Sequence, residues 1–108
     1  MSVRAYVWQR GTAVVLVALV AVHLGMIFYA TGKQLTAADI LARTRGSVPW
    51  ALFYGTFVVA AAVHASIGIQ ASLVEWLSLN RRAARIFGGC FGAALVALGL
   101  RAVAAVVL

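Results

Sequence analysis

Two histidines lie inside long apolar stretches of the sequence, and they are the side chains there that are best suited to chemistry. His64 interrupts the run VVAAAVHASIGIQASLVEW at residues 58–76, and His23 interrupts the apolar run before it. A neutral imidazole nitrogen is a good axial ligand for haem iron. It can equally hydrogen-bond a neighbouring helix, and the histidines alone leave both roles open.

The neighbourhood of His64 favours the haem role. Four small residues share its helical face within two turns: Ala60, Ala61, Gly68 and Ser72. Small side chains allow a flat macrocycle to approach the backbone, although they also allow two helices to pack closely. We therefore predict a haem-iron ligand at His64, with a packing stripe as the alternative.

Helix geometry predicts a similar depth for the two histidines. His64 precedes Glu75 by eleven residues, or about 16 Å of helix, and His23 follows Arg10 by thirteen residues, or about 20 Å. Both distances reach roughly the middle of a hydrocarbon layer about 30 Å thick. A polar side chain at that depth is costly and usually functional. His23 is thus an alternative iron ligand within the chain.

The composition places these histidines in a membrane. The chain has 108 residues, of which 65% are hydrophobic and 10% charged, and its mean hydropathy is +1.04. A soluble domain of this size could not bury so much apolar surface. The net charge of +7 comes from basic residues between apolar runs, which suits lipid headgroups rather than nucleic acid.

Three apolar runs are long enough to cross the membrane, at residues 11–30, 50–74 and 86–108. All should be helices, because lipid leaves no backbone polar group unpaired. Thr36 and Asp39 form a capping-box pattern, which predicts a short interfacial helix in the first loop. The expected fold is an all-α membrane protein with three transmembrane helices, a single anchor domain over residues 1–108.

The charges predict an orientation. Three crossings place the N-terminus and the second loop on one side, with five arginines: Arg4, Arg10, Arg81, Arg82 and Arg85. The other side carries Lys33, Arg43 and Arg45, with Arg101 near the end of the last run. This excess predicts a cytoplasmic N-terminus. The single cysteine, Cys90, excludes a CxxCH attachment of c-type haem and is expected to be a packing residue.

Several motifs together resemble the small haem-binding anchor subunit, D-type, of succinate dehydrogenase (succinate:quinone oxidoreductase). They are RGTAVVL at 10–16, Gly25, LTAADI at 35–40, HASIG at 64–68 and LVEW at 73–76. The resemblance covers roughly residues 8–80. The His-Arg-x-Ser-Gly opening of the sister, C-type anchor is not seen, since residues 9–13 read QRGTA.

The resemblance implies roles for four residues. His64 matches the axial ligand of haem b, and Arg10 matches an arginine near the haem propionates and the quinone. Glu75 and Trp76 match an Asp-Tyr pair at the quinone site. Here Trp76 departs from the pattern, because an indole only donates a hydrogen bond. Taken alone, Arg10 could simply reach the headgroups and Trp76 could be an interfacial anchor.

The resemblance also implies partners. The chain would be a non-catalytic subunit of an oxidoreductase in a bacterial inner membrane, beside a C-type sister anchor, an iron–sulfur subunit and a flavoprotein subunit. It would hold haem b, form part of the site for ubiquinone or menaquinone, and dock the soluble subunits on its basic edge. Glu75 would orient the pocket or relay protons.

Three other functions are weighed. A haemless anchor of a fumarate reductase would leave His64 as a packing residue. A cytochrome b-type subunit could serve another dehydrogenase. A small drug-efflux protein would need four spans and a carboxylate within the membrane, and the sequence offers neither.

Overall fold

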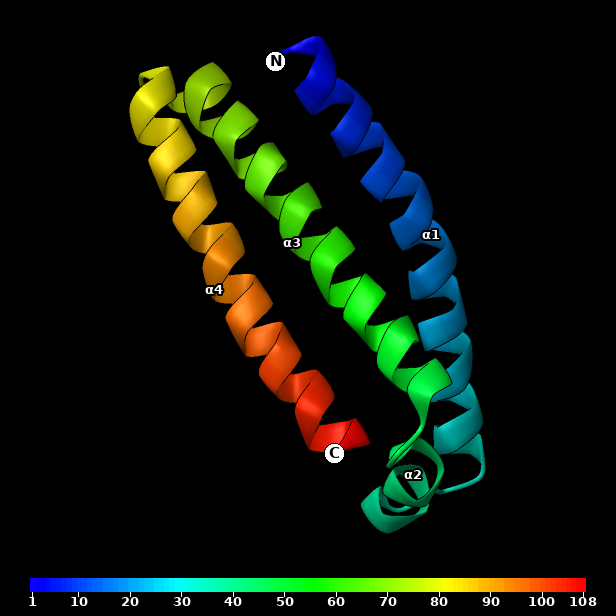
Figure 1. Cartoon of the computed structure of the whole chain (residues 1–108). Coiled ribbons are helices and arrows are strands. Elements are labelled where there is room, and N and C mark those ends of the chain that lie inside the picture. Colours follow the sequence, from blue (N-terminus) through cyan, green and yellow to red (C-terminus); the bar gives the residue numbers. More distant parts are fainter.

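The computed structural model describes all 108 residues as four helices without strands. They are α1 (Val3–Gly32), α2 (Ala37–Thr44), α3 (Val48–Leu77) and α4 (Arg81–Val107). The three long helices run up and down beside one another, and α2 lies across one end of the bundle (Figure 1). Each of the three is long and apolar enough to cross a membrane. The predicted all-α fold with three such helices is confirmed.

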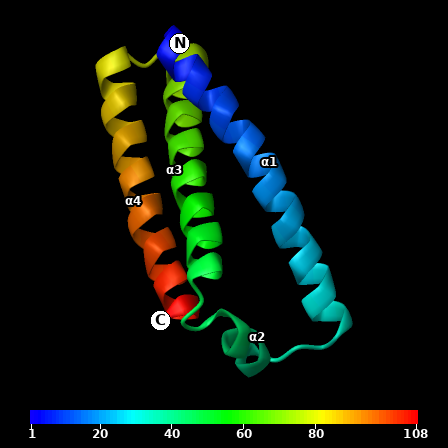
Figure 2. The same ribbon diagram turned by 45° about the vertical axis from the view of Figure 1, so that its right-hand side comes forward.

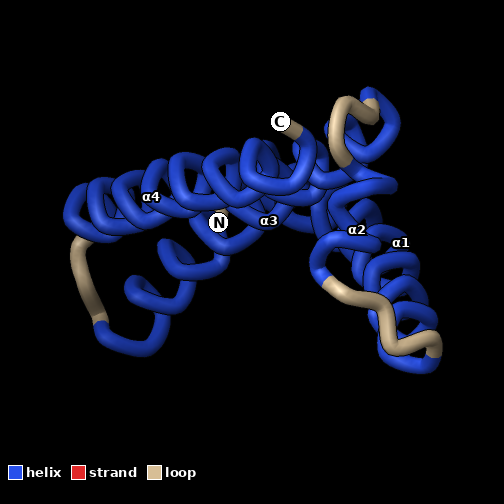
Figure 3. The backbone as a smooth tube through the Cα atoms, turned by 90° about the horizontal axis from the view of Figure 1, so that it is seen from below, coloured by secondary structure: helices blue, strands red, loops and turns tan.

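The long helices extend beyond the apolar runs that predicted them, because polar side chains determine where they begin. The N-caps are Ser2, Ser47 and Asn80, and each side-chain oxygen accepts a hydrogen bond from a backbone N–H in the first turn. As a result α1 begins at Val3 rather than residue 11. Loops are confined to the chain ends and three short connections (Figure 3).

The predicted short helix is confirmed as α2. The Thr36 hydroxyl accepts from the Asp39 N–H, and the Asp39 carboxylate accepts from the Thr36 N–H. The end of α2 also binds the end of α4. Thr44 donates its hydroxyl to the Val106 carbonyl, and the Gly46 N–H donates to the Val107 carbonyl, both at 2.7 Å. These bonds satisfy carbonyls that a helix C-terminus leaves unpaired.

Helices α3 and α4 pack closely through small residues. Gly88 and Gly92 of α4 are buried, and a Cβ at Gly88 would lie 2.9 Å from the Ser66 carbonyl oxygen. The Ser66 hydroxyl donates to the Gly88 carbonyl at 2.8 Å. Such contacts are typical of helix pairs in membranes. Cys90 is exposed, so its predicted packing role is wrong; the glycines fill that role instead.

Helices α1 and α3 meet along a different kind of seam. Its α1 residues repeat at alternating spacings of four and three: Ala5, Gln9, Thr12, Leu16, Leu19, His23, Met26 and Ala30. All are half-buried except Thr12, which is buried. Spacings of four and three keep one face toward the partner helix. Helices α1 and α3 cross at an angle (Figure 2).

Most large apolar side chains point outward. Eight of the 108 residues are buried, and no large side chain is fully buried. In a membrane protein the outward surface faces lipid tails or partner helices, which are equally apolar. The bundle is therefore thin, and its polar side chains lie along the contacts between helices and at the two ends.

Candidate functional site

His64 lies half-buried at the α1–α3 seam. Its Nδ1 is 3.3 Å from the hydroxyl oxygen of Thr12 on α1. Its other ring nitrogen, Nε2, has no hydrogen-bond partner and is not enclosed. One nitrogen is thus engaged within the chain, while the second is free to bind a group from outside it.

Thr12 links this ring to the backbone of α1. It is 8% exposed, and its hydroxyl oxygen lies 2.7 Å from the Trp8 carbonyl oxygen and 3.1 Å from that of Gln9. One turn away, the amide nitrogen of Gln9 lies against Gly68. The amide oxygen of Gln9 is buried without a partner. The immediate surroundings of His64 are therefore polar as well as small.

His23 lies further along the same seam, among aromatic rings. It makes edge-on contacts with Tyr54 and Phe57, with ring centroids 5.8 and 5.7 Å apart. Its Nδ1 is buried without a hydrogen-bond partner. His23 also lines a cavity of about 310 Å³ near α2, together with Arg43 and Thr44.

The two histidines are not at the same depth, and this prediction is wrong. Thr12 lies opposite His64, and His23 is eleven residues further along α1, or about 16 Å. The error came from taking Arg10 as the level of Glu75. In the structure Ser2, at the start of α1, shares a cavity with Glu75. The structure therefore does not bring His23 and His64 together within this chain.

Arg10 points away from His64. It comes two residues before Thr12, which is about 200° around the helix. Its guanidinium lies 5.2 Å from the centre of the Tyr6 ring, a cation–π contact on the exposed surface. The structure does not join Arg10 and His64 into one site within the chain.

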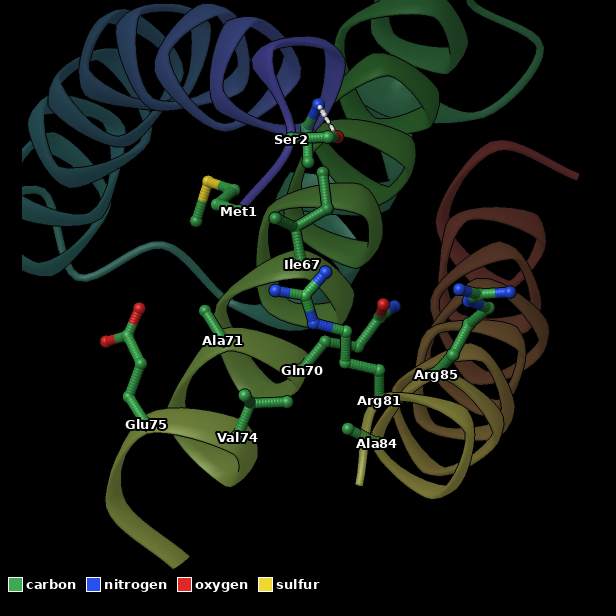
Figure 4. A pocket seen from close by; sticks show the side chains of 11 residues that line it. Met1, Ser2, Ile67, Gln70, Ala71, Val74, Glu75, Arg81, Ala84 and Arg85 are labelled. Carbon is green, nitrogen blue, oxygen red and sulfur yellow. Dashed lines mark hydrogen bonds between the residues drawn. The ribbon is translucent and has the colours of Figure 1, made fainter. Parts of the chain in front are cut away.

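A cavity of about 410 Å³ lies where the start of α1 meets the end of α3 and the start of α4. Glu75 lies on one side of it and Arg81 and Arg85 on the other, with an apolar wall between them (Figure 4). Gln70 adds an amide. The cavity combines an apolar body with a few charged groups, as small-molecule sites do.

The other predicted quinone residues lie outside this cavity. Trp76 is 82% exposed, and neither Trp76 nor Arg10 is among the lining residues. An apolar groove of about 820 Å³ runs along α1 and α3, and Thr12 lines it while His64 does not. No three His, Cys, Asp or Glu side chains cluster as a metal site would require.

Sequence reasoning missed three residues of the site: Thr12 beside His64, and Arg81 and Arg85 across the cavity from Glu75. The spacing of polar residues on α1 was an available signal, because Gln9, Thr12 and His23 share one heptad face. Arg81 and Arg85 were expected on the same side of the membrane as Glu75, which is correct, but only as contacts to lipid headgroups.

Comparison with known families identifies the chain. A model of the succinate dehydrogenase/fumarate reductase transmembrane subunit matches residues 2–106. The chain belongs to this family. No curated protein and no solved structure gives a significant match.

Family membership agrees with the fold. The transmembrane subunit is a multi-pass membrane protein, and membership implies association with the other subunits of the enzyme. Members of the family can bind haem and quinone. The resemblance found in the sequence is therefore confirmed at the level of the family.

Proposed function

We propose that the chain is the D-type, haem-binding anchor of a succinate dehydrogenase, with His64 as one axial ligand of haem b. One observation carries this proposal. In a chain of this family, a histidine well inside the membrane has one nitrogen engaged by Thr12 and the other without a partner. A polar atom left unpaired in lipid is costly, and an iron ligand bond would remove that cost.

The residues around His64 fit a porphyrin. Ala61 and Gly68 lie on its face of α3 and have too little bulk to keep a flat ring away. Since His23 lies too far along α1, the second axial ligand would come from the sister, C-type anchor. When bound, the haem would supply a one-electron carrier within the membrane. The part played by this chain is to present His64 and to exclude water.

The quinone site is proposed at the end cavity. Glu75 is the acidic side chain there, and Gln70 and Arg81 add hydrogen-bond donors. Reduction of a quinone consumes protons, and Glu75 can pass them on or orient the ring. The roles of Arg10 at the haem propionates and the quinone, and of Trp76 at the quinone, stay predictions. Both would involve contacts at a surface shared with partner subunits.

The distribution of basic residues supports the proposed partners. Four arginines lie at the end that holds the cavity, Arg4 near the start of α1 and Arg81, Arg82 and Arg85 at the start of α4, while Arg10 lies further along α1. This end would face the cytoplasm of a bacterium, and it would dock the iron–sulfur subunit, with the flavoprotein subunit beyond. The substrate would be ubiquinone or menaquinone.

A haemless anchor of a fumarate reductase is the second candidate. It is favoured by one observation, the hydrogen bond between His64 and Thr12, because a packing histidine needs no more than such a bond. A cytochrome b subunit of another dehydrogenase would share the haem but have different soluble partners.

The visible spectrum of the purified complex tests the proposal, with the two histidines as a matched pair. His64→Ala should remove the b-type absorbance or shift it strongly, while His23→Ala should leave it in place. Identification of the co-purified chains tests the partners. A wild-type complex without b-type absorbance, or an unchanged spectrum in His64→Ala, would contradict the haem role.

A further inference from the structure

Thr12 is one of two buried polar side chains in the chain, the other being Thr44 at the α2–α4 contact. Thr12 lies at the α1–α3 seam, where a hydrophobic residue would normally be expected. Its surroundings offer three polar atoms: the carbonyl oxygens of Trp8 and Gln9 and the Nδ1 of His64. The placement of one proton among these atoms decides what Thr12 can do.

A hydroxyl has one proton to donate, and a backbone carbonyl can only accept. The Trp8 carbonyl oxygen is 2.7 Å away, whereas Nδ1 is 3.3 Å away. The shorter contact takes the hydroxyl proton. The lone pairs of Thr12 then face Nδ1, so the Nδ1–H of His64 donates to Thr12. A neutral imidazole protonated at Nδ1 carries its free lone pair on Nε2.

We propose that Thr12 is a positioning residue that fixes the tautomer and orientation of His64, so that Nε2 presents its lone pair to the haem iron. This inference rests on the proposed function and adds a residue on a different helix, 52 positions away in sequence. Partners of this kind are general for metal-bound histidines and raise the basicity of the ligand. Here the acceptor is a hydroxyl whose own proton is held by the backbone of α1.

The proposal predicts a redox effect with a definite sign. An acceptor on Nδ1–H increases the electron density at Nε2, which stabilises ferric iron more than ferrous iron. Removal of the acceptor should therefore raise the midpoint potential of haem b. The expected change is about two- to tenfold in the oxidised-to-reduced ratio at a fixed ambient potential, the worth of one hydrogen bond.

The experiment is a redox titration of haem b in the complete membrane complex. Thr12→Val and Thr12→Ala remove the hydroxyl, and Thr12→Ser keeps it. Thr56→Val is the matched control, since Thr56 is an exposed threonine on α3, two turns before His64, and makes no hydrogen bond to the histidine. We expect a raised potential for Val and Ala, and wild-type potentials for Ser and for Thr56→Val. The electron paramagnetic resonance signal of ferric haem should shift in the same two variants.

The outcomes distinguish the role proposed for Thr12 from the haem-ligand role proposed for His64. If the wild-type complex holds haem b that depends on His64, but the Val and Ala variants keep the wild-type potential, Thr12 does not act through the ligand. If Ser shifts the potential as much as Val, side-chain packing is responsible and the proposal is overturned. Failure of Val and Ala alone to assemble would assign Thr12 to helix packing and also overturn it. Absence of haem from the wild type would refute the haem role itself.

Discussion

The two faces of α3 differ in how they handle polar groups. Toward α4 the contact is close and complete: Ser66 donates to the Gly88 carbonyl, and the Gln70 amide donates to Ser66. Toward α1 the contact is looser, and two buried polar atoms lack a partner, the Gln9 amide oxygen and His23 Nδ1. Buried polar groups are normally paired. The comparison indicates that the polar groups of α3 and α4 pair with one another, while the α1–α3 seam holds two buried polar atoms that no group in the chain pairs.

The largest effect should come from breaking the close contact. Gly88→Ala places a Cβ 2.9 Å from the Ser66 carbonyl oxygen and against the Gln70 side chain. We expect it to lower the free energy of unfolding by about 1–3 kcal/mol, as overpacking does. Thermal unfolding of the purified chain in detergent measures the change.

The neighbouring glycine gives a matched control. A Cβ at Gly89 would meet nothing within 4 Å, so Gly89→Ala should be neutral or slightly stabilising, because alanine favours helix. Equal losses in the two variants would show that the α3–α4 contact does not depend on Gly88.

Two glutamine variants should change the free energy of unfolding in opposite directions. Gln9→Met removes a buried oxygen that has no partner, and we expect it to stabilise the purified chain by about 1 kcal/mol. Gln70→Met removes the bond to Ser66 and should cost about 0.6 kcal/mol, a typical value in membranes. Chemical unfolding in mixed micelles would compare the two variants. Destabilisation by Gln9→Met would mean that the Gln9 amide already has a hydrogen-bond partner at the α1–α3 seam.

The smallest effect is expected at α2, outside the spans. Hydrogen bonds from the backbone N–H and then the hydroxyl of Thr36 hold the pKa of the Asp39 carboxyl below its ordinary value of 3.8. A lowered pKa means that the capping box stabilises α2 at neutral pH, and that this contribution is lost as the pH falls below 3.8 through the folded-state pKa.

Nuclear magnetic resonance titration of the Asp39 carboxyl would measure this pKa directly. Thr36→Ala removes the hydroxyl and should move the midpoint up toward 3.8. A midpoint that is the same in the wild type and in Thr36→Ala would show that the Thr36 hydroxyl has no influence on the carboxyl.

The local elements could be predicted from the sequence, while the contacts between helices could not. Long apolar runs predict spans, and the capping box at Thr36 predicts α2, because both signals are local. Thr12 and His64 are 52 residues apart, and no local pattern connects them. The depth of His23 was misjudged because it also depends on how two helices align. Helix α1 begins at Val3, and its start lies level with Glu75, so Arg10 lies deeper than Glu75.

Of the residues expected at the quinone, one lines the end cavity. Glu75 lines the end cavity as one of its charged residues, but Arg81 and Arg85 face it from α4, and only the fold brings that helix alongside. Arg10 and Trp76 were chosen by resemblance. Both residues are exposed, and the spacing of residues in one chain carries no information about contacts with other chains.

The most direct test of the account is the density beside His64 in an electron cryo-microscopy map of the intact complex. The account predicts a porphyrin against α3, with Nε2 of His64 bonded to its iron and Nδ1 still facing Thr12. A map with a helix of another subunit packed on His64, and no macrocycle at that level, would contradict it and leave a haemless anchor.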